Sequence, residues 1–467
     1  MPFSEFLEAR RADCRALVAE LSKQFAYVGI LGSDIRSTRL GVDKNTSDIG
    51  EGGLTECGFV IKMHNGRAFF EYSLDDVVGD KSALAQRIVK SVRVAEALRS
   101  REIEVPVPHD EHLIQSFSRD CDFEEYSDEA VLETAKRVRD EILARDGRIV
   151  NAMVRVSPYT VSKLFVSQNR ELDQFYSWVN AFCAAILADG EKMVMAHEEA
   201  YSNRMGEVLK TLPTRVSPLV EKAGKLATAK PITPGVYDVI TDPSISGLIA
   251  HEAFGHGVEM DQFVKDRALA KQYVGKYVAS PICNMHDGAA AAFSAASYFF
   301  DDDGVLAQDT EIIRNGVLVA GISDLVSATE LGTAPTGNGR RESYKRKAYS
   351  RMTNTFFCPG KDKLEDMIAS IKHGYMLFET NNGMEDPKNW QIQCTAEYGI
   401  EIVDGKLTDN YVSPVVMSGS VPELLQSISM VSDDFRVIGS GGCGKGYKEW
   451  VRVADGGPAL KVKVKLA

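Results

Sequence analysis

Two histidines five residues apart, His251 and His256, constrain the fold of this chain more than any other feature. They stand in the run Gly247-Leu-Ile-Ala-His-Glu-Ala-Phe-Gly-His-Gly-Val-Glu-Met-Asp261, whose apolar spacing predicts a buried helix. Positions i and i+5 point about 140° apart on a regular helix. The imidazoles meet only if one turn holds an extra residue, or if the helix unwinds just before His256, where Gly255 and Gly257 favour a departure. Otherwise the run is an ordinary buried helix that ends at a glycine cap.

The residue types in this run are those of a metal-dependent hydrolase. Imidazole is the commonest protein ligand for zinc, and Glu252, beside the first histidine, can take a proton from metal-bound water. A short β-branched run, Tyr237 to Thr241, precedes the helix, and Asp242 and Pro243 can cap and start it. The pattern indicates a metallohydrolase, with a metallopeptidase first among the candidates.

A catalytic zinc site usually needs a third protein ligand, which must come from elsewhere in the chain. Cys443 is the best candidate, because the glycines around it from Gly439 to Gly444 let the backbone approach another surface closely. Glu259 and Asp261 are rivals, since a carboxylate downstream of such a helix completes many zinc sites. Spacing alone leaves the choice among the three open.

Several motifs together resemble the TldD/PmbA metallopeptidases, and specifically their catalytic, TldD-like branch. The resemblance is carried by His-Glu-Ala-Phe-Gly-His-Gly with the downstream Glu-Met-Asp, and by four later segments. These are Phe300-Asp-Asp-Asp-Gly-Val305 with Ile313-Arg-Asn-Gly-Val317, Thr336-Gly-Asn-Gly-Arg-Arg341, Arg351-Met-Thr-Asn-Thr355 and Gly441-Gly-Cys-Gly444. It covers about residues 230 to 450.

The resemblance implies a zinc ion held by His251, His256 and Cys443, with Glu252 as general base, and it places Cys443 ahead of Glu259 as third ligand. It also implies cleavage of unfolded or short peptides with low sequence preference, in a chamber formed by two subunits. The partner would be a second copy or a PmbA-like subunit that lacks the metal ligands.

The polar segment near residue 351 offers candidate contacts for an extended peptide. Arg351-Met-Thr-Asn-Thr355 is a strand candidate that can pair its main chain with a substrate, which would give low sequence preference. Asn338, Arg351, Thr353 and Asn354 are therefore candidate substrate-binding residues. The alternatives are an internal strand for the second segment and a tight turn for Gly337-Asn338-Gly339.

Composition and charge exclude several other classes of protein. The net charge of −12 argues against non-specific binding to nucleic acid, which requires cations against phosphates. No run approaches 18 apolar residues, so no membrane-spanning helix is expected. The mixed charge of the first eleven residues and eight scattered cysteines without a paired framework predict a cytoplasmic protein with reduced thiols.

The pattern along the chain predicts an α+β fold with N-terminal helices on an antiparallel sheet. Helices are expected at 3–23, 82–101, 128–145 and 205–228, the last interrupted at Pro213, and strands at 25–31, 58–63, 68–72 and 148–157. The apolar runs in 158–200 do not decide between helix and strand. The linker Lys230-Pro-Ile-Thr-Pro-Gly235 separates a domain at 1–229, with a possible further break near 110–130, from a mostly β domain at 230–467 that carries the metal-binding helix.

Turn dipeptides support the β character of the second domain. Asp303-Gly304, Asn315-Gly316 and Asp404-Gly405 each stand between strand candidates, and His64-Asn65-Gly66-Arg67 is a hairpin turn in the first domain.

Three other functions stay open. The chain is a non-catalytic peptide-binding partner subunit if its histidines are structural, or a regulator of a nucleic-acid enzyme, since some members of the family have been described as gyrase modulators. It is a different metallopeptidase, similar to dipeptidyl peptidase III, if Glu259 and not Cys443 completes the site.

Overall fold

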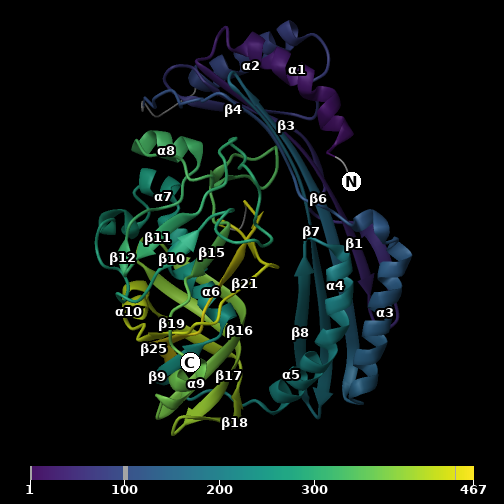
Figure 1. Ribbon diagram of the computed structural model, residues 1–467, viewed down its shortest axis with the longest axis vertical. Helices are drawn as coiled ribbons and strands as arrows, with labels where there is room; N and C mark the ends of the chain where they lie inside the picture. The colour runs from purple at the N-terminus through teal and green to yellow at the C-terminus, as the bar shows by residue number, and fades with distance from the viewer. Residues whose placement is uncertain (1–2, 98–103, 447–448) are drawn as a thin grey trace.

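One large sheet dominates the N-terminal half of the molecule and several smaller sheets form the C-terminal half (Figure 1). The computed structural model describes residues 3–97, 104–446 and 449–467. The elements of the N-terminal half are α1 (Glu5–Leu21), β1 (Tyr27–Val42), β2 (Ser47–Glu51), β3 (Glu56–His64), β4 (Phe69–Leu74), α2 (Lys81–Ala97), β5 (Leu113–Ser118), η1 (Phe123–Glu125), α3 (Asp128–Arg145), β6 (Ile149–Ser167), β7 (Arg170–Asp189), β8 (Lys192–Ser202), α4 (Met205–Thr211), η2 (Leu212–Arg215) and α5 (Val216–Thr228).

The N-terminal sheet has the strand order β4-β3-β1-β6-β7-β5, with β2 paired to β1 and β8 paired to β7. The undecided residues 158–200 form most of the long antiparallel strands β6, β7 and β8. All pairs are antiparallel except β5 with β7. Because β5 lies inside the suggested break at 110–130 and joins this sheet, one sheet continues across that break.

Helices cover this sheet where apolar faces were expected. Leu7 and Leu17 of α1 and Ile88 of α2 share a core with Ile30 and Ile61 of the sheet. The helices α3 and α5 pack on β6, β7 and β8 in a second core. Figure 1 shows the sheet as a curved layer, with α1 and α2 outside its upper end and α3 outside its lower part. The four predicted helical ranges are confirmed, although residues 98–101 of the second lie outside the described residues.

The C-terminal half contains short helices among many strands. Its elements are β9 (Gly235–Thr241), α6 (Pro243–Leu248), the π-helix η3 (Ile249–Gly255), η4 (His256–Val258), α7 (Met260–Val264), η5 (Leu269–Tyr273), β10 (Met285–Asp287), β11 (Thr310–Arg314), β12 (Val317–Leu318), α8 (Leu325–Leu331), β13 (Gly339–Arg340), β14 (Tyr349–Ser350), β15 (Asn354–Phe357), α9 (Leu364–Ala369), β16 (His373–Asp386), β17 (Gln391–Val403), β18 (Lys406–Val412), β19 (Val415–Ser420), α10 (Val421–Gln426), β20 (Met430–Val431), β21 (Arg436–Ile438), β22 (Gly442–Cys443), β23 (Val451–Arg452), β24 (Ala454–Gly457) and β25 (Leu460–Leu466).

Two C-terminal sheets enclose the helix that carries the histidines. One has the order β12-β11-β10-β15-β24-β21, and the other has the order β16-β9-β25-β19-β17-β18. Ile245, Ile249 and Phe254 of the helix are buried in the main C-terminal core. This arrangement confirms the predicted α+β class, with a mostly β second half that carries the helix.

Two of the predicted turns in this half are hairpins. The residues Asn315 and Gly316, between β11 and β12, have φ of 48° and 81°, and Asp404 and Gly405, between β17 and β18, have φ of 47° and 76°. Such angles suit the twist of a two-residue hairpin. Asp303-Gly304 also lies in a tight turn, with φ of 75° at Gly304, but the strands expected beside it are reduced to one antiparallel bridge between Phe300 and Leu306. Asp303 itself is buried in an ion pair with Lys62.

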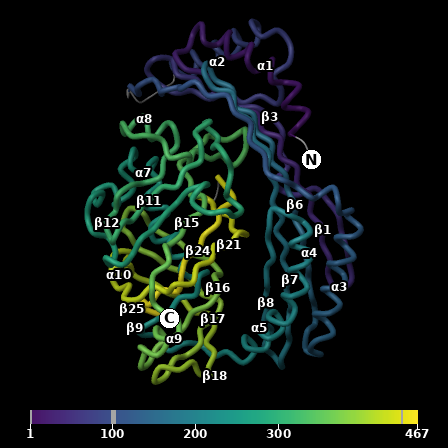
Figure 2. Tube along the Cα trace, viewed as in Figure 1, coloured from purple at the N-terminus to yellow at the C-terminus, as the bar shows by residue number. Residues whose placement is uncertain are grey.

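The chain passes between the two halves near β18, where the N–H of Lys230 donates to the carbonyl of Tyr411 at 2.9 Å (Figure 2). Among the described residues, no helix is both long enough and apolar enough to cross a bilayer.

Candidate metal centre

The helix that carries the two histidines changes its winding just before it ends. Asp242 Oδ1 accepts the N–H of Ile245 at 2.8 Å and caps the first turn. The following residues, Ile249–Gly255, are π-helical, and the N–H of His256 donates to the carbonyl of His251, five residues earlier. The sequence allowed two ways for the helix to bring the histidines together, and the structure contains the first of them, an extra residue in one turn. It turns the two rings toward each other, with centroids 5.2 Å apart.

Glycines let neighbouring segments touch this helix. A Cβ at Gly255 would lie 1.9 Å from Met352 Sδ, and a Cβ at Gly247 would lie 2.4 Å from the backbone nitrogen of Gly456. No larger residue fits at either position unless these neighbours move. The helix is therefore held on both sides, as a metal site with fixed ligand positions requires.

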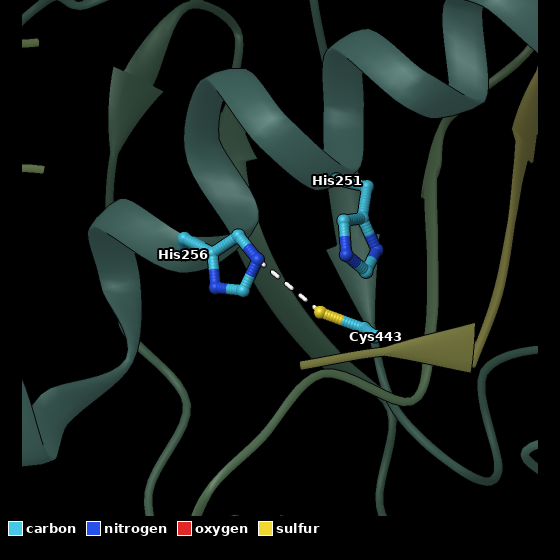
Figure 3. A group of neighbouring side chains, drawn as sticks. All are labelled: His251, His256 and Cys443. Atoms are coloured by element: carbon cyan, nitrogen blue, oxygen red, sulfur yellow. Dashed lines mark hydrogen bonds between the residues drawn. The ribbon is translucent and has the colours of Figure 1, made fainter. Parts of the chain in front are cut away.

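Cys443 reaches the histidines from the hairpin formed by β22 and β23. Its Sγ lies 3.2 Å from His256 Nε2, and one candidate ligand atom from each of His251, His256 and Cys443 lies within 4.8 Å of the others. Figure 3 shows the three side chains pointing toward one common space. The structure thus brings together three side chains from two regions far apart in the sequence, with the donor set of a zinc site.

The charges of these three groups favour the form of the cysteine that binds metal. Burial alone would raise the pKa of the Cys443 thiol, but the neighbouring His251 and His256 lower it to about 4. Burial alone would lower the pKa of His251, and the thiolate raises it to about 9. The cysteine is therefore a thiolate at neutral pH, which is the ligand form.

Glu259 contacts His256 through the ring nitrogen that does not face Cys443. Its Oε2 lies 3.3 Å from His256 Nδ1, whereas His256 Nε2 faces Cys443 Sγ at 3.2 Å. Glu259 Oε1 accepts from Arg351 Nε at 3.1 Å, and Arg351 Nη2 donates to the carbonyl of Cys443 at 3.0 Å. One buried network thereby orients the second histidine and the cysteine loop together. Lys445, 3.0 Å from the carboxylate, is the main cause of its lowered pKa, against the effect of burial.

Glu252 lies half-buried beside the first histidine and makes no hydrogen bond or ion pair among the described residues. Gly383 on β16 leaves the space for it, since a Cβ there would come within 2.5 Å of Glu252 Cγ. A carboxylate next to a ligand and free of other partners is equipped to accept a proton.

Two further acids near the ligands were not found from the sequence. Asp455 lies beside Gly247, where a Cβ would be 2.7 Å from its Oδ1, and burial raises its pKa to about 6 although His251 opposes the shift. Glu385 has both carboxylate oxygens buried without a hydrogen-bond partner among the described residues. The only sequence mark of Asp455 is an Asp-Gly pair, which ordinarily indicates a turn.

The four candidate substrate-binding residues are buried inside the fold, which contradicts that prediction. The Nδ2 group of Asn338 and the Oγ1 group of Thr353 donate to Asp287 Oδ1 at 2.7 and 2.9 Å, and Asn354 Nδ2 donates to the carbonyl of Gly288 at 3.1 Å. Arg351 belongs to the Glu259 network. Of the four, Asn354 alone lies on β15, which is internal between β10 and β24 and offers no free edge to a peptide. The buried carboxylate of Asp287, which no motif marked, takes up the donors of Asn338 and Thr353.

A second group with metal-ligand spacing lies where the two halves meet. One ligand atom from each of His197, Glu379 and Glu397 also lies within 4.8 Å of the others. Lys222 Nζ lies 2.5 Å from Glu379 and 2.7 Å from Glu198. Lys222 balances Glu379, whereas Glu397 has no ammonium partner among the described residues and burial raises its pKa to about 8, so the group joins the halves through the Lys222–Glu379 ion pair.

The His-His-Cys set, with the carboxylates of Glu252 and Glu385 beside it unpartnered among the described residues, defines a hydrolase of the metal-dependent class. A model of the PmbA/TldA metallopeptidase C-terminal domain matches residues 234–465. A metalloprotease of Synechocystis is 31% identical over 69% of this chain and 70% of that protein. A zinc metalloprotease TldD homolog of Saccharolobus solfataricus is 30% identical over 60% of this chain and 65% of that protein.

Solved structures share the fold over nearly the whole chain. A crystal structure from Thermotoga maritima has a TM-score of 0.78 at 18% identity, covering 97% of this chain and 98% of that one. TldE from Thermococcus kodakarensis has a TM-score of 0.74 at 19% identity, covering 97% and 100%. The chain belongs to the PmbA/TldD metallopeptidase family, as its motifs predicted, and it is a metalloprotease.

Proposed function

We propose that this metalloprotease is a zinc-dependent peptidase in which His251, His256 and Cys443 hold the ion and Glu252 is the general base. The observation that carries the proposal is the convergence of Cys443 on the π-helical turn, with its Sγ 3.2 Å from His256 Nε2. Two imidazoles and a thiolate are ligands that zinc accepts, and three protein ligands leave one position for solvent or substrate.

The residues present fit such an ion in the ionised thiol of Cys443 and in the support of His256. The thiol is already ionised, and the ring of His256 is held at Nδ1 by Glu259. Bound zinc would supply a Lewis acid that polarises a carbonyl and lowers the pKa of a nearby water toward 7.

Glu252 supplies the proton transfers. It lies one residue after His251 on a helix that Met352 and Gly456 hold in place, so its carboxylate stays beside the reacting groups. We assign it the proton that the attacking water loses, and the return of that proton to the leaving amine.

The proposed substrate is an unfolded or short peptide bound with low sequence preference. The internal position of β15 removes the first candidate for main-chain pairing, but β22 pairs only with β23 among the described residues and so keeps a free edge. At Gly442, next to Cys443, nothing lies within 4 Å of where a Cβ would be. A peptide backbone can pair with this edge without contacting side chains, and pairing of this kind reads the main chain rather than the sequence.

Metal analysis and peptidase assays on the wild type and three variants test the proposal. We expect one zinc per chain in the wild type, retained zinc with turnover reduced about 10²- to 10⁴-fold in Glu252→Gln, and lost zinc in Cys443→Ala. Glu365→Gln, on the short helix α9, is the matched control and should resemble the wild type. Full activity in Glu252→Gln, or full zinc in Cys443→Ala, would contradict the assignment.

The subunit composition and the cytoplasmic location stay predictions. We propose a dimer with a second copy or with a PmbA-like subunit that lacks the ligands, and light scattering on the purified chain separates a self-sufficient dimer from a monomer that needs a partner. A catalytically silent role for this chain is disfavoured because all three ligand positions and Glu252 are present.

A further inference from the structure

A cavity of about 100 Å³ lies where the large N-terminal sheet meets the C-terminal half. Tyr159 and Tyr176 line it from the sheet, and Tyr298, Arg340, Trp450 and Arg452 line it from the other side. A buried water needs about 10–15 Å³ measured in this way, so the cavity has room for roughly seven to ten groups of that size. That is about the size of one medium amino-acid residue.

The floor of this cavity is aromatic and fixed. Tyr298 Oη donates to the carbonyl of Gly337 at 2.6 Å, and Tyr159 Oη donates to the carbonyl of Ala295 at 3.4 Å. Because their hydroxyl groups are bonded to the protein, these rings present apolar surface to whatever occupies the space.

Two guanidinium groups of the cavity have no acidic partner. Arg340 lies 5.6 Å from the centre of the Tyr298 ring and donates Nη1 to the carbonyl of Met352 at 2.7 Å. Arg452 lies 5.9 Å from the centre of the Tyr159 ring. Neither forms an ion pair with any described residue, although the chain carries 66 acidic side chains against 54 basic ones. Backbone carbonyls and ring faces hold both groups in place, which leaves further N–H donors for a ligand.

The acidic side chains that line the cavity are already engaged. Asp302 pairs with Lys163, burial raises the pKa of Asp301 well above its usual range and so favours its neutral form, and Glu342 pairs with Arg346 at 3.7 Å. The charge left over in the cavity is therefore positive, and it favours an anion.

Both arginines contact segments that adjoin the metal centre. Arg452 stands opposite Gly442 in the β22–β23 hairpin, and Gly442 precedes Cys443. Arg340 holds the main chain of Met352, whose sulfur packs against Gly255 between the two histidines. Because successive residues of a strand alternate in direction, Arg452 projects from the face of the hairpin opposite to Cys443. The cavity and the metal centre therefore lie on opposite faces of one two-stranded hairpin, so a peptide held in the cavity would have to pass the edge of this hairpin to present a bond to the metal.

We propose that this cavity binds the C-terminal residue of the peptide substrate, its carboxylate between Arg340 and Arg452 and an apolar side chain against the tyrosines. The inference rests on the proposed peptidase function and gives it a substrate class, namely peptides with a free C-terminus that are cut near that end. A guanidinium pair matches a carboxylate in charge and in hydrogen-bond geometry.

Calorimetric titration of the wild-type protein with three small ligands tests this without requiring turnover. The ligands are N-acetyl-leucine, its amide, and the α-amide of N-acetyl-glutamate, which carries its carboxylate on the side chain. We expect N-acetyl-leucine to bind at least about tenfold more tightly than the other two, since charge-assisted hydrogen bonds to a carboxylate are lost or displaced in them. Equal binding of acid and amide would overturn the proposal, and tighter binding of the glutamate ligand would assign the cavity to an acidic side chain instead.

Variants show whether the two arginines are responsible. Arg452→Gln and Arg340→Gln should each weaken N-acetyl-leucine about tenfold or more and leave the amide unchanged, and Arg452→Lys should recover part of the loss. Arg87→Gln, at an exposed site on α2 without an ion pair among the described residues, removes the same charge elsewhere and should bind like the wild type. Equal loss in Arg87→Gln, or none in Arg452→Gln, would contradict the assignment.

Peptide cleavage separates failure of this subsite from failure of the proposed function. Peptides with a free C-terminus should be cut with a lower KM than the same peptides as C-terminal amides, and Arg452→Gln should abolish the difference while its zinc content is unchanged. Cleavage that ignores amidation overturns the subsite and leaves the peptidase standing. Tight binding of N-acetyl-leucine without any cleavage supports the subsite and contradicts the proposed peptidase function.

Discussion

Glu259→Gln is the substitution that separates a supporting carboxylate from a metal ligand. The carboxylate lies 3.3 Å from His256 Nδ1, 3.1 Å from Arg351 Nε and 3.0 Å from Lys445 Nζ. Glutamine keeps an acceptor for the imidazole but removes the charge that fixes its orientation. Loss of such a partner typically lowers metal affinity 10- to 100-fold, which corresponds to about 1.4–2.7 kcal/mol.

The same change should also weaken the fold without metal. The side chain of Arg351 is 1% exposed and loses the one carboxylate partner it has among the described residues, whereas Lys445 keeps Asp261 at 2.7 Å. Breaking a buried pair on one side costs about 3–5 kcal/mol, most of it here from the stranded guanidinium. Arg351 also holds the carbonyl of Cys443, so the two losses are linked through the cysteine loop.

Chelator competition for zinc and urea unfolding with and without zinc measure the two effects. Asp261→Asn is the matched control, because it removes a carboxylate from the same lysine without touching a histidine, and it should leave zinc affinity within a few-fold of the wild type. If Glu259→Gln loses zinc entirely while Cys443→Ala keeps it, Glu259 is the third ligand and the assignment of Cys443 is wrong. Unchanged affinity and stability in Glu259→Gln would refute the supporting role.

Two further substitutions test the helix that carries the histidines. Gly255→Ala places a Cβ 1.9 Å from Met352 Sδ, so we expect about 1–3 kcal/mol of destabilisation and weaker zinc binding, measured by thermal unfolding with and without zinc. The control Gly224→Ala in α5, where nothing lies within 4 Å of the added Cβ, should be neutral or stabilising. Equal results for the two variants would argue against the close contact. Burial raises the pKa of Asp242 from 3.8 to about 6, so its contribution to stability is complete below pH 3.8 and is lost as the pH rises through 6. Asp242→Asn keeps the cap but does not titrate, so its stability relative to the wild type should rise by about 3 kcal/mol between pH 4 and pH 7 in urea unfolding, and parallel pH profiles would contradict this.

The winding of the metal helix was predictable to within two alternatives because the constraint is local. His251 and His256 at i and i+5 can face each other only through an extra residue in a turn or through unwinding, and Gly255 lowers the cost of either. The choice between them depends on tertiary packing. The π turn lets Met352 lie against Gly255, and a short-range pattern contains no information about Met352.

The spacing of residues in the sequence could not identify the third ligand. Cys443 is distant from the histidines in sequence, and its approach depends on the hairpin of β22 and β23 and on the bond from Arg351 to its carbonyl. Glu259 was an equally good donor by spacing. Its role differs because two cations, Arg351 and Lys445, occupy its oxygens. Which carboxylates are neutralised in this way is a property of the assembled fold.

The long N-terminal strands were undecided for a different physical reason. From residue 158 on, much of β6 and β7 is buried on both faces, and the buried residues include polar ones such as Thr160, Ser162 and Gln174, so the sequence lacks the alternation that marks a strand with one exposed face. Periodicity therefore could not distinguish them from buried helices. The shorter strand β9 was predicted because it is rich in β-branched residues and is followed directly by a capped helix.

The incorrect substrate-binding prediction for residues between 338 and 354 gives a criterion for deciding which other polar side chains can bind a ligand. Conspicuous polar residues near a strand look like ligand contacts, yet the side-chain donors of Asn338, Thr353 and Thr355 bond to the buried Asp287 and are satisfied within the fold. A polar motif is thus a candidate for binding only when the folded chain leaves its donors free. Arg340 and Arg452 meet that condition, since no described carboxylate pairs with either and both line an open cavity. The criterion of free donors therefore excludes the polar residues first predicted to bind substrate and favours Arg340 and Arg452 instead.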